Sequence, residues 1–450
     1  MDTVAERGVD SLRVDSKVAV RFLSRVPGER IHEHPASPPT AFPGPPRGPA
    51  TRGTLRVPSH PSPPSKSRSA TPGTPSTTRY IDTPAEADRF LGSLGTPDRV
   101  AVDTEGASFH RFVDRIYLLQ ISTASAHAIL DPLAIGKPPR LGDLLESTQS
   151  ETVFHDADYD LRLLFQDYGW HARHLFDTRV AAQLLGIRAF GLAALLERYL
   201  GVKLDKKHQR ADWSMRPLPQ DMLDYATQDT MYLLPLRDKL AEDLERAGRW
   251  EWAREEFERL EGTRWDHDGS IDAYQRIKGA RDLTRRELAI LRELVAWRDG
   301  VAREMDRATF RVAGNETLLE LARIAPRSVD ALREIRGMPR GVIERRGASV
   351  LDAIARGLAV PDDQLPRFPR AARWDRDPDF DTRVNRLRSI RETVAQRLDL
   401  DPGFLISRER LETIARKRPT SLDELAQADD LRRWQIDVMG NDLLAALAAG

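Results

Sequence analysis

RVAVDTE, at Arg99–Glu105, is a short run of small and β-branched residues with two acidic residues at its end. Successive side chains of a strand point to opposite faces, so we expect Asp103 and Glu105 on one face and Thr104 on the other. Two adjacent carboxylates repel each other unless a cation lies between them, and a divalent ion would serve. A strand that runs into a turn would also give this pattern, so the rest of the chain must decide.

The segments after this strand predict an α/β domain. Apolar strands are predicted at Ile116–Ser122, Ala126–Leu130 and Thr152–Phe154. Helical periodicity follows in a helix from Asp158 and in Arg179–Leu185, Leu192–Leu200 and Asp221–Leu234. Strands followed by helices predict a mixed sheet that is flanked by helices.

Glycine and proline mark the expected helix ends. Gly186 and Gly201 stand where C-terminal caps are expected, and Pro235 should kink or split the last long helix. Asp156 or Asp158 could cap the helix near residue 158.

Further acidic residues follow the first pair. Asp160, in HDADYDLRLLF, falls in the first turn of a predicted helix, where the helix dipole stabilises negative charge. Leu161 and Leu164 should face the core, which places Asp160 near the sheet. Tyr225 and Asp229, in DYATQDTMYLL, are four residues apart and share one helix face. Taken alone, that pair is equally consistent with a surface hydrogen bond.

The order of these three elements is more specific than any one of them. A strand with D-x-E, an aspartate that opens a helix and a helical Y-x-x-x-D resemble the three exonuclease motifs of the ribonuclease D family, the tyrosine variant of the DEDD superfamily. The matching stretches are VAVDTEG, HDADYDLRLL, YATQDTMYLLPL and the intervening LDKKHQRADWSMRPL. The resemblance covers residues 79–262 and implies a ribonuclease H-like α/β exonuclease domain.

The resemblance also implies a set of catalytic residues. Asp103, Glu105, Asp160 and Asp229 would be metal ligands, and Tyr225 would be the fifth catalytic residue. Two divalent ions, Mg²⁺ or Mn²⁺, would clamp the scissile phosphate, and together they would balance about −4 of carboxylate charge. Tyr225 would orient the attacking water or help to deprotonate it. A tyrosine with its ordinary pKa of about 10 is a poor base alone, so the metal would do most of the activation. The products would be nucleoside 5′-monophosphates.

A basic segment precedes the third motif. Its candidate substrate-binding residues are Lys206, Lys207, Gln209, Arg210 and Trp213. The cations would contact backbone phosphates, and Trp213 would stack on a base. The alternative is a solvated loop in which Trp213 packs against the core.

The remainder of the chain predicts two small all-α bundles. Residues 272–360 resemble the helicase-and-ribonuclease-D C-terminal (HRDC) domain through WRDGVAREMD and FRVAGNETLLELA. Ala308–Thr309 replaces the prolines typical of that family, from which we expect a small change in loop stiffness. Residues 382–450 resemble a second, more divergent HRDC domain. Residues 361–381 form a linker rich in Pro, Asp and Arg, and residues 1–78 a disordered tail rich in Pro, Ser and Arg.

Composition limits the other possibilities. The chain has no cysteine, which excludes disulfides, thiolate metal sites and cysteine nucleophiles. Lys+Arg and Asp+Glu both number 69, so any affinity for nucleic acid must come from local patches. There is no apolar run long enough to span a bilayer and no signal-peptide pattern, so we expect a cytoplasmic protein. Nothing in the sequence indicates an obligate protein partner.

These patterns leave three functional hypotheses. The leading one is a 3′→5′ exoribonuclease that acts on RNA with a free 3′ end, tRNA precursors above all. The second is a 3′→5′ DNA exonuclease, against which the chain's lack of polymerase or helicase motifs argues. The third is a non-catalytic RNA-binding adaptor, although all five catalytic positions are filled.

Overall fold

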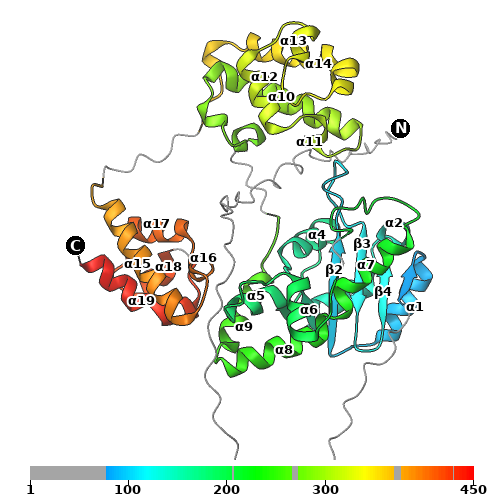
Figure 1. Ribbon diagram of the computed structural model, residues 1–450, viewed down its shortest axis with the longest axis vertical. Helices are drawn as coiled ribbons and strands as arrows, with labels where there is room; N and C mark the ends of the chain where they lie inside the picture. Colours follow the sequence, from blue (N-terminus) through cyan, green and yellow to red (C-terminus); the bar gives the residue numbers. More distant parts are fainter. Residues whose placement is uncertain (1–77, 205–206, 266–271, 369–376, 429, 450) are drawn as a thin grey trace, which may run out of the picture. The chain divides into compact units, whose positions relative to one another are not determined.

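A computed structural model of the chain describes residues 78–204, 207–265, 272–368, 377–428 and 430–449. The predicted tail lies outside the described residues except for Thr78, and so does Lys206. Within the described ranges, no helix is both long and apolar enough to cross a bilayer. An α/β part comes first along the chain, and two groups of helices follow it (Figure 1).

The α/β part contains one mixed sheet. Its strands are β1 (Arg79–Ile81), β2 (Arg99–Glu105), β3 (Leu118–Ser122), β4 (His127–Leu130), β5 (Glu151–Phe154) and β6 (Leu175–Asp177). Their order across the sheet is β1-β4-β3-β2-β5-β6. Strand β3 is antiparallel to both of its neighbours, β2 and β4, and the other pairs are parallel. The D-x-E pair therefore ends a central strand.

Helices flank this sheet, as the sequence predicts. They are α1 (Pro84–Leu94), α2 (Pro132–Ile135), α3 (Pro139–Glu146), α4 (Asp158–Tyr168), α5 (Thr178–Leu184), α6 (Leu192–Leu200), α7 (Gln220–Met231), α8 (Leu233–Arg246) and α9 (Trp250–Leu260). Helix α7 packs against β2, β3 and β4, and Figure 1 shows it lying along these strands. Helix α8 contacts β2 and β5, and α9 contacts β6.

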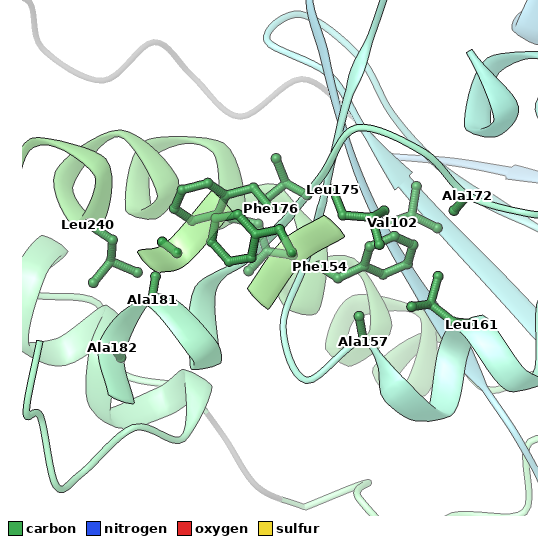
Figure 2. Packing of buried hydrophobic residues seen from close by; sticks show 14 of the residues in the cluster. Val102, Phe154, Ala157, Leu161, Ala172, Leu175, Phe176, Ala181, Ala182 and Leu240 are labelled. Carbon is green, nitrogen blue, oxygen red and sulfur yellow. The ribbon is translucent and has the colours of Figure 1, made fainter. Parts of the chain in front are cut away.

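The core of this part is built from alternate strand residues and helix faces. In Figure 2, Val102 of β2, Phe154 of β5 and Leu161 of α4 pack together. Phe176 of β6 lies on the side of α5 and α8 and has its ring 4.8 Å from that of Phe257. Burial of these side chains, about 25 cal/mol for each Å² of apolar surface, holds β2 and α4 in a fixed relation.

Most predicted element ends are close to the observed ones. Helix α7 ends at Met231 and α8 begins at Leu233, so the predicted helix is split beside Pro235, which has no N–H to continue it. Gly201 caps α6 in the left-handed conformation, with φ of 68°. Gly186 also has a positive φ, 75°, just after α5.

The structure differs from the prediction in several places, and helices α1, α2, α3 and α9 correspond to no predicted element. The three-residue strands β1 and β6 are too short to show a periodic pattern, and only their pairing within the sheet makes them strands. The strand predicted from Ile116 begins at Leu118, because the Ile116 N–H donates to the Asp167 carboxylate at 2.7 Å. Neither Asp156 nor Asp158 caps α4. The N-cap residue of α4 is Ala157, which has no capping side chain, and its N–H donates to the Asp177 carboxylate at 2.7 Å.

The rest of the described chain forms two helical bundles. The first has α10 (Arg285–Glu304), α11 (Thr309–Val312), α12 (Asn315–Ile324), α13 (Val329–Arg333) and α14 (Arg340–Ala359), with short 3₁₀ turns at Ala273–Arg276, Ala280–Asp282 and Asp362–Gln364. The second has α15 (Phe380–Leu398), α16 (Pro402–Leu405), α17 (Arg408–Lys417), α18 (Leu422–Ala428) and α19 (Arg433–Ala448).

The two bundles repeat each other more closely than the sequence indicates. Helices α11 and α16 each have four residues, and α12 and α17 each have ten. Both ten-residue helices end at a left-handed residue that is not glycine, Ala325 with φ of 46° and Arg418 with φ of 48°. The substitution Ala308–Thr309 leaves the short helix α11 in place.

Candidate active site

The first part of the site is the end of β2. Asp103 pairs across the sheet with Gln120 of β3, and Glu105 pairs with Leu118. Residues two apart on a strand share a face, so the two carboxylates point to the same side of the sheet. That side is the one covered by α7, which carries Tyr225 and Asp229.

Two kinds of contact hold α7 in place on this face. The hydroxyls of Thr230 and Ser122 are hydrogen-bonded at 2.8 Å, and Nδ1 of His127 lies 2.8 Å from the same Ser122 oxygen. Ala226 lies one turn before Thr230 on α7, and Met222 lies two turns before it. Both are buried in an apolar cluster with Leu118 of β3. The cluster also contains Ile129, Trp213 and Leu218. The catalytic candidates therefore sit on a helix that is fastened at both ends of their span.

This packing brings three carboxylates together. Each of Asp103, Glu105 and Asp229 offers a carboxylate oxygen that lies within 4.8 Å of the other two. All three side chains are half-buried, so their oxygens face a common space with limited access to water. This is the spacing that ligands of one cation require.

The fourth carboxylate reaches the site from α4. Asp160 is only 5% exposed and accepts hydrogen bonds from the Thr104 N–H at 3.0 Å and from the Thr104 hydroxyl at 2.5 Å. Thr104 is the residue between the two β2 carboxylates, so these bonds tie α4 to the same strand. Asp160 lies outside the group of three within 4.8 Å, but its charge acts on them.

Burial and mutual repulsion make these acids hold their protons. Desolvation, and after it the charge of Asp229, raises the pKa of Asp103 well above its ordinary value. The pKa of Glu105 and that of Asp160 are likewise raised well above the usual range, first by desolvation and then by the charge of Asp103. Desolvation and the charge of Asp160 raise the pKa of Asp229 to about 7. Four ionised carboxylates are therefore unfavourable here without an added positive charge.

The residues that the structure describes do not supply the charge that would balance these carboxylates. Among the described residues, no lysine, arginine or histidine forms an ion pair with any of these four carboxylates. An all-oxygen set of ligands, with no thiolate in the chain, fits hard divalent ions such as Mg²⁺ and Mn²⁺. The residues present thus fit the metal site that the sequence predicts.

Tyr225 lies one turn before Asp229 on α7 and is half-buried. Its ring centroid is 5.7 Å from that of His208 and 6.2 Å from that of Trp213. These two rings limit how the tyrosine can rotate. Because residues four apart share a helix face, Tyr225 lies on the same face of α7 as Asp229.

The predicted substrate-binding residues are dispersed. Lys207 is exposed and forms an ion pair with Asp221 at 3.0 Å, whereas Lys206 lies outside the described residues. Gln209 and Arg210 are exposed, and the Arg210 guanidinium lies 5.8 Å from the ring of Phe109, in the loop that follows β2. Gln209 and Arg210 thus remain accessible to a ligand.

Trp213 is 1% exposed and belongs to the apolar cluster under α7. A base can stack only on an exposed ring, so this burial favours the packing alternative for Trp213. At the end of this segment, Nε of Arg216 forms an ion pair with a carboxylate oxygen of the buried Asp131 at 2.5 Å. His155 is also a packing residue, hydrogen-bonded to Thr178 at 2.9 Å, and burial lowers its pKa to about 4.

An anchor of the loop between β2 and β3 was not predicted from the sequence. The Tyr159 hydroxyl donates to both carboxylate oxygens of Asp114, at 2.8 and 2.9 Å, and burial raises the pKa of Asp114 to about 6. Gly106 lies so close that an added Cβ would be 2.1 Å from the Tyr159 oxygen. The only signal was that Tyr159 and Gly106 directly adjoin the catalytic motifs.

Family models match three regions of the chain. Residues 78–245 match a model described as 3′-5′ exonuclease, and residues 287–354 and 381–447 both match the HRDC domain. The exonuclease match contains all five catalytic candidates.

Known relatives align over most of the chain. The ribonuclease D of Granulibacter bethesdensis is 31% identical over 350 residues, which cover 77% of this chain and 86% of the relative. That of Xanthomonas oryzae is 32% identical, over 78% of this chain and 95% of the relative.

Solved structures agree in fold. Escherichia coli RNase D, described as an exoribonuclease involved in structured RNA processing, superposes with a TM-score of 0.65 and 27% identity, over 83% of this chain and 99% of that one. A protein from Bifidobacterium adolescentis gives a TM-score of 0.71 and 28% identity, over 82% of this chain and 97% of that one.

Proposed function

Because the chain belongs to the ribonuclease D family of 3′→5′ exoribonucleases, we propose that Asp103, Glu105, Asp160, Asp229 and Tyr225 hydrolyse its RNA substrate from the 3′ end. The observation that carries this assignment is the group of carboxylate oxygens within 4.8 Å, which no basic side chain of the described residues neutralises. Dependence on a divalent metal is typical of this family.

We propose that two ions, Mg²⁺ or Mn²⁺, are held by the four carboxylates. When bound, such ions supply positive charge that polarises a water and stabilises the leaving oxygen of a phosphodiester. The protein contributes fixed ligands: α7 is fastened to β3 through Thr230, and α4 is fastened to β2 through Thr104. Ligands held in this way need no rearrangement when the phosphate arrives.

Tyr225 has a separate role in this proposal. Its hydroxyl holds the attacking water in line with the scissile bond, and the rings of His208 and Trp213 restrict its motion. Water attack on the terminal phosphodiester would release a nucleoside 5′-monophosphate and leave a new 3′ hydroxyl.

The test is an exonuclease assay on a 5′-labelled RNA with Mn²⁺, with Mg²⁺ or with EDTA, beside Asp103→Asn. Stepwise shortening and release of mononucleotides by the parent alone, and only with metal, support the proposal. Release that survives EDTA, or that Asp103→Asn retains, would place the activity elsewhere. An all-deoxy strand of the same sequence, if degraded as fast as the RNA, would favour the DNA exonuclease.

For the substrate we propose RNA with a structured body and a free 3′ end, tRNA precursors above all. The described exposed residues Gln209 and Arg210 support contact with such a strand, and we propose Lys206 and Lys207 for the same surface. The enzyme should trim a tRNA precursor that has a 3′ trailer, and the trimming should stop near the mature 3′ end. An unstructured RNA of the same length should be degraded without such a stop. Equal degradation of both would contradict this substrate choice.

The domain boundaries belong to the same proposal. We propose an exonuclease domain at 79–262, HRDC domains at 272–360 and 382–450, a linker at 361–381 and a tail at 1–78. The family-model matches at 78–245, 287–354 and 381–447 support this division. We also propose that the protein is located in the cytoplasm and needs no obligate protein partner.

A further inference from the structure

Gln120 is a polar residue with apolar neighbours on both sides in β3. It is fully buried, with 0% exposure, and stands in β3 between Leu119 and Ile121. It pairs directly with Asp103 of β2 on one side and with Ile129 of β4 on the other. Directly opposed residues of antiparallel strands share a face, with Cβ atoms about 4.5–5.5 Å apart. Gln120 therefore lies beside Asp103 on the catalytic face.

The side-chain amide of Gln120 has no partner of its own. Neither its oxygen nor its nitrogen is accessible to water, and neither makes a hydrogen bond with any of the described residues. A buried amide can donate two hydrogen bonds and accept two, and leaving all of them unmade is costly. An apolar residue of similar size would avoid this cost, so the amide needs an explanation.

The neighbours of Gln120 place it under the catalytic helix. Two residues along the same face, Ser122 is hydrogen-bonded to Thr230 of α7. Two residues the other way, Leu118 packs in the cluster that contains Ala226. Gln120 thus lies beneath the stretch of α7 that carries Tyr225 and Asp229, with Asp103 as the adjacent acceptor.

We propose that Gln120 is a positioning residue for the cation site. Its amide NH₂ donates a hydrogen bond to the Asp103 carboxylate when the site holds a divalent ion, and so fixes which oxygen faces that ion. A neutral donor suits this place, because an arginine or lysine would neutralise the carboxylate and compete with the cation. The inference rests on the proposed function of the site as a divalent-cation centre.

The test measures cation binding as well as activity. Gln120→Met keeps the size of the side chain and removes both amide atoms, and Gln120→Leu is prepared beside it in case one variant does not fold. Mn²⁺ binding to the full chain is followed by titration calorimetry, and Tm without metal reports on the fold. We expect the Kd for Mn²⁺ to rise about 10–100-fold, as for other residues that orient a ligand, while Tm without metal stays equal or rises.

A matched control is available in the same sheet. Thr152 of β5 is also 0% exposed with an unpartnered hydroxyl, and its pairing with Val100 places it on the opposite face from Asp103. Thr152→Val removes that buried polar atom and should leave the Kd for Mn²⁺ unchanged. A purely structural role for Gln120 would instead lower Tm and leave the Kd unchanged.

A double variant tests whether Gln120 acts through Asp103. If it does, Gln120→Met combined with Asp103→Asn binds Mn²⁺ no more weakly than Asp103→Asn alone. A Kd for folded Gln120→Met or Gln120→Leu within twofold of the parent would overturn the inference. If Asp103→Asn also bound Mn²⁺ like the parent, the proposed cation site itself would be wrong. This result distinguishes failure of the cation site from failure of the proposed role of Gln120.

Discussion

The Thr104 hydroxyl donates to the Asp160 carboxylate across 2.5 Å, and the Thr104 N–H donates to the same oxygen at 3.0 Å. Thr104 lies between the two acidic residues of β2, whereas Asp160 comes 56 residues later, at the start of α4. A single residue thus links the first and second catalytic motifs through its backbone and side chain. The position of Asp160 in the site depends on these two bonds.

Thr104→Val should weaken the site while preserving the fold. Valine has nearly the same shape but no hydroxyl, so Asp160 would keep the backbone donor and lose the side-chain one. We expect the Kd for Mn²⁺ to rise about tenfold or more, the range for residues that orient a ligand. Thr104→Ser, which keeps the hydroxyl, is the control. Equal Mn²⁺ binding by both variants would contradict the role of this bond.

Tyr225→Phe should slow the chemical step and spare the metal. Loss of a group that positions a reacting water or proton typically costs about 10²–10⁴-fold in rate. We expect a fall in kcat within that range and an unchanged Kd for Mn²⁺. Tyr232→Phe, at the C-terminal end of the same helix, is the matched control and should be active. A Tyr225→Phe variant with parental kcat would remove the tyrosine from the mechanism.

Stability without metal should fall as pH rises. Burial and the charge of Asp160 raise the pKa of Asp229 to about 7, above its ordinary 3.8. Between these values the folded protein holds a proton that the unfolded chain has released, so unfolding is favoured progressively as pH increases. The asparagine of Asp229→Asn cannot ionise, so this variant carries no buried charge at position 229. Its Tm in EDTA should therefore exceed that of the parent at pH 8.

The size of this effect can be followed by calorimetry across pH 5–8. A difference of 1 kcal/mol corresponds to about 2–4 °C in Tm for a domain of this size. The advantage of Asp229→Asn should shrink toward pH 5, and saturating Mn²⁺ should reverse it. A variant that is less stable than the parent in EDTA at pH 8 would contradict the unfavourable burial of this charge.

Cation binding should release protons at neutral pH. The raised pKa of Asp229, and the raised pKa values of its three carboxylate neighbours, mean that protons leave when ligands bind an ion. Mn²⁺ affinity should therefore weaken as pH falls below 7. Titrations in buffers of different ionisation enthalpy measure the protons released. Binding that releases no proton at pH 7 would show that the carboxylates are already ionised.

Gly106→Ala should disturb the loop after β2. The new Cβ would lie 2.1 Å from the Tyr159 oxygen and 2.9 Å from Asp114, distances that force the loop or the tyrosine to move. We expect lower Tm and lower activity. Adding Tyr159→Phe removes the nearest clashing atom and should restore part of the loss. If the double variant is no better than Gly106→Ala, the clash is not with this hydroxyl.

The central elements of the fold could be predicted well, because their patterns depend on residues that are close together in the sequence. Strand β2 is a run of small and β-branched residues, helix α6 has strong helical periodicity, and α7 is separated from α8 beside a proline. The positions of these elements therefore follow from nearby residues. Strands β1 and β6 have three residues each and exist because neighbouring strands supply their hydrogen bonds. Such pairing depends on residues far apart in the chain and leaves no local pattern.

The site shows the same division. Asp103 and Glu105 could be placed on one face from strand geometry, and Tyr225 and Asp229 from helix geometry. The contacts that bring these elements together could not be predicted, because Thr104 with Asp160 and Ser122 with Thr230 join distant segments. The place of Gln120 could not be predicted for a related reason: in the sequence it is a polar residue between Leu119 and Ile121, and only the sheet register places it beside Asp103.

We propose above all that four carboxylates form a divalent-cation centre that hydrolyses RNA from its 3′ end. The most direct test follows a 5′-labelled RNA with the parent and with Asp103→Asn, across a titration of Mn²⁺ that begins in EDTA. We expect no cleavage in EDTA, stepwise loss of 3′ nucleotides as Mn²⁺ is added, and a rate at least about 10²-fold slower for Asp103→Asn. Shortening of the labelled RNA by the parent in EDTA, or by Asp103→Asn at the parental rate, would contradict this mechanism.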